Sequence, residues 1–327
     1  MLLKKNEAVS AANNTVHADK KVNAIIYSSE NEYVSQLQYF FEEVAKKAGY
    51  EVALRDAKNS VSLQLAQVKR AQEQGSKSII VNLVSSYSAP EILKAAGNMK
   101  IVMVTTPPAD MNILNQNAIY VGSEGTTAGI IQGEWLSNYL KERGITTIRY
   151  ILLQGPLKMV TTTMRTNAVL QTLAQNGIIA IPAAPPVDAN YIRREAMSKM
   201  LPILRSGIKF DTIISNNDSM ALGAIEAMES LNMDPSKKII VGVDAIEPAL
   251  QAILEGKMSM TVFQNAKAQG STAVTALINM LNGNPISQGT GYQVAKDNPY
   301  VIWIPLELVT RQHIPKDLYY KLTNLPQ

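Results

Sequence analysis

The sequence predicts an α/β fold made of two Rossmann-like lobes, each built on a parallel sheet. Strand-like apolar runs alternate with helical patterns along the chain, which is typical of parallel sheets covered by helices on both faces. Ile239-Ile240-Val241 is a continuous apolar run, as expected for a strand buried on both faces. The length of 327 residues also exceeds one ordinary domain, so we expect two lobes.

In the first half of the chain, strands and helices are predicted from residue 22 onward. The strands are short apolar runs, and the helices are longer segments with apolar residues three or four positions apart. In order, they are strand 22–27, helix 32–48, strand 50–54, helix 61–74, strand 78–83, helix 89–96, strand 100–105, strand 119–122 and a helix from 125 to about 143.

The second half repeats this alternation. Its predicted elements are strand 148–153, helix 163–176, strand 178–181, helix 192–206, strand 212–215, helix 219–231, strand 238–243, helix 248–255, strand 258–263, helix 267–282 and strand 300–304. Helix 219–231 shows the reason, because Ala221, Ala224, Met228 and Leu231 form one apolar stripe. Each half opens with a strand, a polar turn and a long helix, which favours two similar lobes.

The composition excludes several classes of protein. The net charge of +4 comes from 31 basic and 27 acidic residues spread along the chain, so no nucleic-acid partner is expected. Cysteine is absent, and His17 and His313 lack metal-ligand spacing, so we predict no metal and no cofactor. No apolar run is long enough for a transmembrane helix.

The first 20 residues form a polar, Ala/Asn-rich stretch that we expect to be a disordered tail. The start of the chain lacks the apolar core of a signal peptide. The chain is therefore either cytosolic or a mature form whose export signal has been removed, and the residues alone leave both open.

Polar clusters follow three strands of the second half, namely Asn216-Asn217-Asp218, Asp244 and Gln264-Asn265. Ligands of open α/β sheets bind at the carboxyl ends of strands, so these groups are candidates for one ligand site. Amides and carboxylates suit a neutral polyhydroxyl or amine-bearing ligand better than phosphate, which calls for glycine-rich loops and cations.

Each of these residues also has a purely structural interpretation. Asn217 and Asp218 suit helix capping, and Asp244 with Glu247 has the spacing of a capping box. Arg165 lies near a helix start, where a cation gains nothing from the helix dipole, which favours another purpose. Tyr33 and Tyr191 could stack on a ligand or only cover their helices.

Catalytic motifs are missing from the sequence. There is no Gly-x-Gly-x-x-Gly after a strand, no phosphate loop and no Gly-x-Ser-x-Gly elbow. Without cysteine or a well-placed histidine, nucleophilic catalysis has few candidates, so we predict that the chain is not an enzyme.

At these residues the chain resembles the type I periplasmic sugar-binding proteins, most closely their galactose/glucose-binding branch. The resemblance runs from Asn23 onward in a specific order of short motifs. They are Ile-Tyr-Ser-Ser-Glu-Asn-Glu-Tyr at 26–33, Asn-Leu-Val at 82–84, Tyr-Val-Gly-Ser-Glu at 120–124, Asn-Asn-Asp-Ser-Met-Ala-Leu-Gly at 216–223, Val-Gly-Val-Asp-Ala at 241–245, Gly-Thr-Gly-Tyr at 289–292 and Trp-Ile-Pro at 303–305.

The resemblance implies two lobes that close on a sugar by a hinge motion. The N-terminal lobe would comprise residues 21–122 plus 266–302, and the C-terminal lobe 125–263 plus 305–327, joined by three crossovers near 121–125, 263–266 and 302–305. The implied ligand-binding residues are Asn31, Tyr33, Thr105, Met159, Thr161, Arg165, Tyr191, Asn217, Asp244 and Gln264.

Four of these positions depart from the galactose/glucose pattern. That branch carries aspartate at Asn31, asparagine at Thr105, histidine at Met159 and aspartate at Thr161. Two lost carboxylates would weaken hexose binding by roughly 10²–10⁴. We therefore expect a ligand other than free galactose or glucose. The Asp-rich calcium loop of the family is also missing before strand 148–153, so we predict no calcium.

The predicted function is that of an extracytoplasmic solute-binding protein, monomeric, which captures a sugar or sugar-like compound and delivers it to an ABC importer. The alternative is a ligand-sensing ectodomain or co-receptor for a membrane histidine kinase or chemoreceptor, which would use the same residues. A cytosolic repressor would need a DNA-binding module before Val22, and the first 20 residues are too few to supply it.

Overall fold

A computed structural model describes residues 20–314, which form two compact units. The first unit comprises the described chain up to Ser29, then Val34–Gly122 and Ala266–Ile304. The second comprises Glu30–Tyr33, Ser123–Asn265 and the described chain from Pro305 to Ile314, while residues 315–327 of the expected C-terminal lobe lie outside the described residues. Apart from the short segment Glu30–Tyr33, the chain passes between the units after Gly122, Asn265 and Ile304. Residues 1–19 of the expected tail, with His17, lie outside the described residues.

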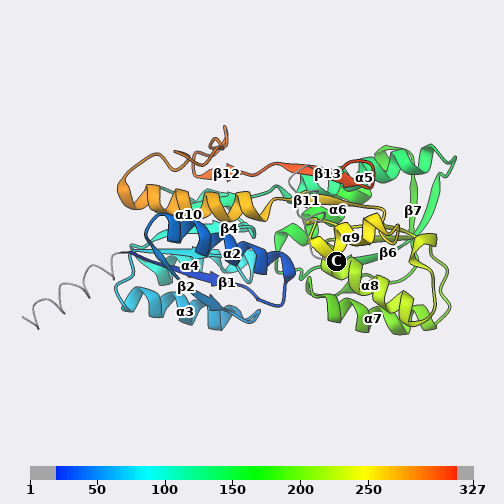
Figure 1. Cartoon of the computed structure of the whole chain (residues 1–327), viewed down its shortest axis with the longest axis horizontal. Helices are drawn as coiled ribbons and strands as arrows, with labels where there is room; N and C mark the ends of the chain where they lie inside the picture. Colours follow the sequence, from blue (N-terminus) through cyan, green and yellow to red (C-terminus); the bar gives the residue numbers. More distant parts are fainter. Residues whose placement is uncertain (1–19, 315–327) are drawn as a thin grey trace, which may run out of the picture. The chain divides into compact units, whose positions relative to one another are not determined.

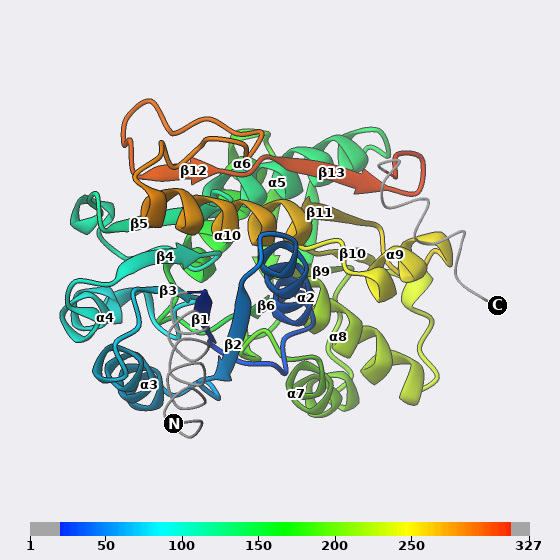
Figure 2. The same ribbon diagram turned by 60° about the vertical axis from the view of Figure 1, so that its left-hand side comes forward.

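The first unit contains a six-stranded parallel sheet with the order β12-β5-β4-β3-β1-β2 (Figure 1). Its strands are β1 (Lys21–Ile26), β2 (Glu51–Asp56), β3 (Ser78–Val81), β4 (Lys100–Val104), β5 (Ala118–Gly122) and β12 (Val301–Trp303). Its helices are α2 (Glu32–Lys47), α3 (Val61–Glu73), α4 (Ala89–Ala96) and α10 (Ala266–Asn282), with short 3-10 turns η1 (Ser86–Ser88) and η2 (Met111–Ile113). Helices α2 and α10 adjoin each other on one face, and α3 and α4 on the other (Figure 2).

The second unit contains a seven-stranded sheet with a core path β13-β11-β10-β9-β6-β7, and β8 pairs with β6. Its strands are β6 (Thr147–Gln154), β7 (Ile179–Pro182), β8 (Val187–Asp188), β9 (Thr212–Ser215), β10 (Ile239–Val241), β11 (Met260–Gln264) and β13 (Leu306–Thr310). Its helices are α5 (Gly125–Lys141), α6 (Val160–Gln175), α7 (Arg193–Arg205), α8 (Asp218–Ser230) and α9 (Glu247–Leu254), with the turn η3 (Pro235–Lys237). All pairings are parallel except that of β13 with β11.

The predicted α/β class with two parallel sheets is confirmed, and each predicted helix lies within three residues of an observed one. Two strands were not predicted, β8 and β13. β13 follows β12 after only two residues and adds an antiparallel edge to an otherwise parallel sheet, which helix–strand alternation does not signal. β8 has only two residues, too few to show any periodicity.

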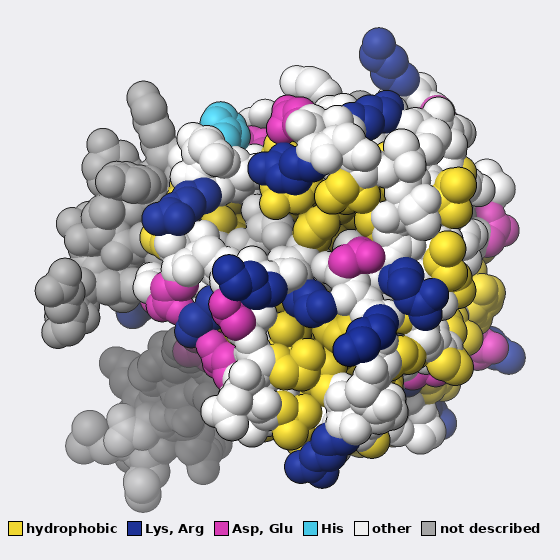
Figure 3. Space-filling view, turned by 90° about the vertical axis from the view of Figure 1, so that its right-hand side faces the viewer, with side chains coloured by type: hydrophobic (Ala, Val, Ile, Leu, Met, Phe, Trp, Pro, Cys, Tyr) yellow, Lys and Arg dark blue, Asp and Glu magenta, His cyan; other side chains and the backbone are white. Residues whose placement is uncertain are grey.

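Charged side chains are dispersed on the face of the second unit shown in Figure 3, where Lys and Arg alternate with apolar and uncharged groups. None of the helices between residues 20 and 314 is both long and apolar enough to cross a bilayer.

The packing of α5 on α6 depends on two glycines of α5. The two helices cover one face of the second sheet, where Leu136 and Val169 belong to a fully buried cluster with strand residues. A Cβ on Gly129 would lie 2.4 Å from the Arg165 carbonyl oxygen, and one on Gly133 would lie 2.6 Å from Thr172 Cβ. The glycines therefore let α6 approach α5 closely, and this approach fixes the spacing between the two helices on that face of the sheet.

Gly129→Ala is expected to destabilise the protein by about 2 kcal/mol, because overpacking outweighs the roughly 1 kcal/mol gain in helix propensity. Urea denaturation would measure the change. Asn138→Ala, on the exposed side of the same helix, is the control and is expected to change stability little. A Gly129→Ala variant as stable as the parent protein would show that the α5–α6 contact yields without cost.

Candidate functional site

Five of the ten predicted ligand residues lie at or just beyond carboxyl ends of strands of the second sheet, or in the turn that follows one. Met159 and Thr161 begin α6 after β6, Asn217 follows β9, Asp244 follows β10, and Gln264 ends β11. All five are buried, from 1% exposed for Met159 to 7% for Thr161. Neighbouring parallel strands end at the same edge of a sheet, so the fold brings these side chains to one place.

Arg165 lies one helical turn beyond Thr161 on the same side of α6, and its guanidinium is held from two directions. Nη1 donates to the Asn216 carbonyl oxygen at 2.7 Å, and Nη2 donates to Gln264 Oε1 at 2.7 Å. The side chain is only 6% exposed, and among the described residues Nε has no hydrogen-bond partner. A buried guanidinium requires acceptors and counter-charge, so Arg165 is not a solvated surface residue.

Asp244 lies in a strained turn between β10 and α9. Its φ is 126° and that of Ala245 is 56°, both in the left-handed region that side chains other than glycine rarely adopt. Such conformations cost about 1–3 kcal/mol each and persist only where the surroundings enforce them. The expected capping box is wrong, because α9 begins at Glu247 with Ile246 as its N-cap, so Asp244 lies outside the helix start.

Two buried carboxyls lie near Arg165, and burial raises the pKa of both. For Asp244 the pKa rises well above its usual value because of burial, while the Arg165 charge and a hydrogen bond from Asn217 oppose the rise. Burial raises the pKa of Asp218 to about 7, against hydrogen bonds from Thr261, Ile246 and Ala245 and the attraction of Arg165. One cation is thus shared by two carboxyls in a site from which water is largely excluded.

Asn217 caps α8, as the sequence predicted, and it also reaches toward the candidate site. Its Oδ1 accepts from the Met220 N–H at 3.0 Å, which is the N-cap bond. Its Nδ2 donates to the Tyr191 carbonyl oxygen at 3.4 Å, and Asn31 Nδ2 donates to the same oxygen at 3.2 Å. The Tyr191 carbonyl therefore orients two of the predicted ligand residues.

The Tyr191 ring is used in packing within the second unit. Its hydroxyl is 2.8 Å from Thr162 Oγ1, and the ring occupies the space where a Cβ on Gly155 would lie, 2.1 Å from Cζ. Tyr33 is also buried, with 3% of its surface exposed. Of the two interpretations of Tyr191, a stacking ring or a packing residue, the geometry gives direct contacts for the second.

Thr105 belongs to the first unit, separate from the residues above. Its Oγ1 donates to Gln269 Oε1 at 2.7 Å, and its carbonyl oxygen accepts from the Tyr120 hydroxyl at 2.9 Å. The residue has a φ of 64°, and Tyr120 reaches it across Gly122, where a Cβ would lie 2.1 Å from the tyrosine oxygen. Two side chains and a glycine thus hold this strained threonine in place.

Asn216 and Asp218 belonged to the polar cluster that the sequence analysis singled out, but they were not among the ten ligand residues implied by the resemblance. Asn216 accepts from Arg165 through its carbonyl and from the Gly155 N–H through Oδ1 at 3.2 Å. Asp218 was interpreted either as part of a ligand cluster or as a cap, and the N-cap of α8 is Asn217. One sequence signal pointed to both, the uninterrupted Asn216-Asn217-Asp218 cluster at a strand end, but nothing in it told which side chain faces which neighbour.

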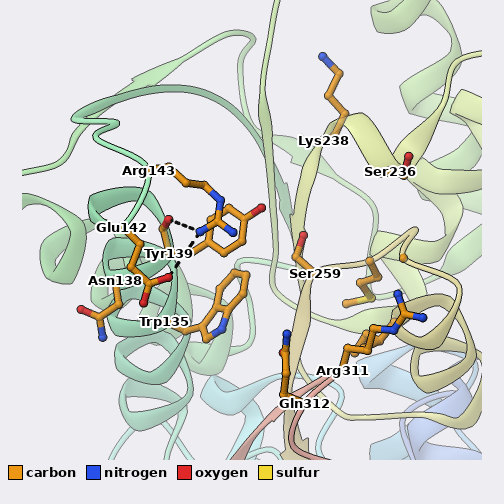
Figure 4. A pocket seen from close by; sticks show the side chains of 13 residues that line it. Trp135, Asn138, Tyr139, Glu142, Arg143, Ser236, Lys238, Ser259, Arg311 and Gln312 are labelled. Atoms are coloured by element: carbon orange, nitrogen blue, oxygen red, sulfur yellow. Dashed lines mark hydrogen bonds and ion pairs between the residues drawn. The ribbon is translucent and has the colours of Figure 1, made fainter.

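A separate groove of about 440 Å³ opens on the second unit (Figure 4). One wall is the end of α5, where the Trp135 and Tyr139 rings stack at 4.9 Å and Arg143 lies 3.6 Å above Tyr139. Lys238 precedes β10 and Ser259 precedes β11, so the groove lies at the amino ends of the strands. Ligands of open α/β sheets bind at the opposite ends, and no predicted ligand residue lines this groove.

Within residues 20–314, no group of three His, Asp or Glu side chains is placed to hold a metal ion. The side chains of the candidate site offer hydrogen-bond donors and acceptors. Carboxylates and amides would accept or donate to hydroxyl groups, and the guanidinium would donate.

Arg165→Met is expected to lower the free energy of unfolding by about 3–5 kcal/mol, because the variant leaves buried carboxyls without their cation. The loss should grow as the pH rises from 5 to 8. Removing Arg165 raises the folded-state pKa of Asp218 and Asp244 further above the unfolded value, so their ionised forms cost more at high pH. Urea denaturation at both pH values measures this.

Arg149→Met serves as the control for the pH series, because the Arg149 side chain is exposed and its Nε donates to the Lys209 carbonyl oxygen, whereas the bond to Asp211 comes from the backbone N–H, which the substitution keeps. Its effect should be small and the same at both pH values. If Arg165→Met lowered the free energy of unfolding by the same amount at pH 5 and pH 8, this result would contradict the shared-cation arrangement.

Known proteins resemble this chain over most of its length. The periplasmic binding protein domain family matches residues 22–285. A putative rhizopine-binding protein from Rhizobium meliloti is 27% identical over 87% of this chain and 88% of its own length. A D-galactose/methyl-galactoside binding periplasmic protein from Haemophilus influenzae is 29% identical over 90% and 92%.

Solved structures show the same fold. An ABC transporter solute binding protein from Bacillus halodurans C-125 with bound myo-inositol is 29% identical, with a TM-score of 0.74 over 94% of this chain and 98% of that one. The arabinose ABC transporter component from Shewanella sp. ANA-3 has a TM-score of 0.78 at 22% identity, covering 93% and 94%. The match to the family covers more than half of the chain, and it agrees with the prediction of a binding protein rather than an enzyme. The chain belongs to the periplasmic binding protein family.

Proposed function

We propose that this protein captures a compact sugar or polyol for an ABC importer, with Arg165, Asn217 and Asp244 as its principal hydrogen-bonding residues. The observation that carries the proposal is the convergence of a buried guanidinium, carboxylate and amide at the carboxyl edge of the second sheet. Packing alone gives no reason to bury these groups together, because burying charges is costly unless they are paired. A ligand rich in hydroxyl groups uses all three.

The donor and acceptor inventory suits neighbouring hydroxyl groups. An ionised carboxylate only accepts, a guanidinium only donates, and an asparagine amide does both. Two of the guanidinium nitrogens, Nη1 and Nη2, are directed by Asn216 and Gln264, which leaves Nε and further N–H groups for a ligand oxygen. Because these partners fix Arg165 before any ligand arrives, binding costs little additional side-chain entropy.

The relatives support the same class of ligand. Proteins that cover most of this chain are named for binding rhizopine, galactose, ribose and xylitol, and the myo-inositol complex is 29% identical. Their shared feature is a small polyhydroxylated molecule. We extend this class to the present chain, and with it the membrane importer as partner and an extracytoplasmic location.

The four departures from the galactose/glucose pattern favour a ligand with an apolar face. Met159, buried to within 1% of its surface, places a thioether where that branch carries histidine. Thr161 and Asn31 replace carboxylates with neutral groups, which weakens any ligand that needs two charged acceptors. We propose that the Tyr191 backbone carbonyl, rather than its ring, contributes to the site by orienting Asn31 and Asn217.

A thermal-shift screen over sugars, sugar alcohols and nucleosides is expected to find a stabilising compound, because a ligand at 100 times its Kd adds about 2.7 kcal/mol. Asp244→Ala should abolish this shift. Asp234→Ala is the matched control, since Asp234 is an exposed aspartate that only caps η3. A full shift in the Asp244 variant would show that Asp244 serves the turn and not the ligand.

Titration calorimetry with galactose and glucose tests the ligand class separately. We expect both hexoses to bind more weakly than a deoxy or substituted sugar or a cyclic polyol, because the site lacks the additional carboxylates. Sub-micromolar binding of either free hexose would overturn this expectation while leaving sugar capture itself intact.

A further inference from the structure

Asp218 is a buried acid with partners outside its own helix. It is the first residue of α8, and its side chain is fully buried. Its Oδ1 accepts from Thr261 Oγ1 at 2.7 Å, and its Oδ2 accepts from the Ile246 N–H at 3.2 Å. The carboxylate thus joins the start of α8 to strand β11 and to the turn that follows β10.

That turn is the strained one that carries Asp244. Ala245, the second of its two left-handed residues, donates its N–H to Thr261 Oγ1 at 3.4 Å, the hydroxyl that donates to Asp218. Hydrogen bonds at Ala245 and Ile246 therefore reach one buried carboxylate, directly or through Thr261. The backbone is also tied on the other side, where the Asp244 N–H donates to the Val262 carbonyl oxygen at 2.8 Å.

Gly242 makes room for this arrangement. A Cβ at Gly242 would lie 2.2 Å from Asp218 Oδ1, so any side chain there would displace the carboxylate. Thr261 and Gln264 are three residues apart on β11 and so point to opposite faces of the sheet. Asp218 thus supports the Asp244 turn from the face opposite to the Arg165–Gln264 pair.

Helix capping does not explain these contacts. The N-cap bond of α8 is made by Asn217. An acidic residue in the first turn stabilises a helix through the helix dipole, and it does so even when its side chain is exposed. Full burial adds a desolvation cost that a dipole interaction at a surface position would avoid. The bonds from Thr261 and Ile246 account for the buried position, and those residues belong to other elements.

We propose that Asp218 is a positioning residue that holds the Asp244–Ala245 turn in its left-handed conformation and thereby orients the Asp244 carboxylate. Thr261 and Gly242 are parts of the same device, the first as a bridging hydroxyl and the second as the space for the carboxylate. The consequence for ligand affinity rests on the proposed function, whereas the effect on the turn does not.

Charge gives the device a dependence on pH. Arg165 attracts the Asp218 carboxylate, Asp244 repels it, and Glu32 lies near enough to Asp244 to raise the pKa of that group as well. Burial raises the pKa of Asp218 to about 7 while the Asp244–Ala245 turn is held in its left-handed conformation, which we call the closed turn. If the turn opens and exposes Asp218 to water, the pKa would return toward its usual value of 3.8. The closed turn therefore binds the proton more tightly, and opening becomes easier as the pH rises from about 4 to 7.

Amide hydrogen exchange on the full chain tests the proposal without any ligand. In Asp218→Ala, we expect the Ala245 and Ile246 amides to exchange at least about tenfold faster than in the parent, which corresponds to one lost hydrogen bond. Amides within β10 and β11 should change less. Asp218→Asn should restore part of the protection and weaken the dependence on pH, after correction for intrinsic exchange rates, because Asp244 still titrates in the same turn.

Thr261→Val keeps Asp218 and decides the matter if Asp218→Ala does not fold. It should speed exchange at Ala245, while Thr272→Val should leave the turn unchanged. Thr272 is an equally buried threonine in the first unit, and its hydroxyl has no hydrogen-bond partner among the described residues. Wild-type protection of the turn in both Asp218→Ala and Thr261→Val, or a uniform loss over the whole second unit, would overturn the proposal.

Titrations of the same variants with myo-inositol and galactose separate the two claims. Faster exchange together with at least tenfold weaker binding of either compound supports the positioning role and the site. Faster exchange with unchanged binding would support the role of Asp218 in the turn but contradict ligand contact by Asp244. If neither compound binds the parent protein, the exchange result still decides the positioning role.

Discussion

The burial of Arg165 is the constraint on which the second unit depends. A guanidinium away from water must be surrounded by acceptors and counter-charge, and each of these comes from a different element. Gln264 reaches it from β11, Asn216 from the end of β9, and Asp244 attracts it from the turn after β10. The cation thus joins α6 to three neighbouring strand ends. A shift of α6 would therefore change the interactions of Arg165 with all three strand ends.

Close backbone approach sets the position of α6 beside α5. Gly129 and Gly133 allow the α6 backbone to approach α5 to distances that no Cβ would permit. The same device recurs on the opposite face, where Gly242 admits the Asp218 carboxylate. Glycines that contribute no polar side chain therefore help to decide where Arg165 and Asp244 lie. In this protein, the geometry of the candidate site therefore depends on how the helices pack on the sheet.

Periodicity was enough to predict the helices and the parallel strands other than the two-residue β8, because their burial follows from local patterns. β13 was out of reach, since its pairing is an antiparallel addition made after a crossover. The polar clusters at the strand ends led to the proposed site, but they did not show how Asp218 differs from Asn217. Both are polar residues at a helix start, but Asn217 caps α8, whereas Asp218 accepts a hydrogen bond from Thr261 on another element. The difference depends on Gly242, 24 positions further along the chain.

The strained turn at Asp244 follows from two demands on one position. A glycine would adopt a φ of 126° without cost but would bring no carboxylate to the edge of the sheet. An aspartate in relaxed backbone would carry the carboxylate but would break the bond of its N–H to Val262 or the path into α9. The strain is maintained because Asp218, Thr261 and Val262 hold the turn from both sides. A side chain fixed in this way needs no rearrangement on binding, so the conformational cost is met by folding and not by ligand affinity.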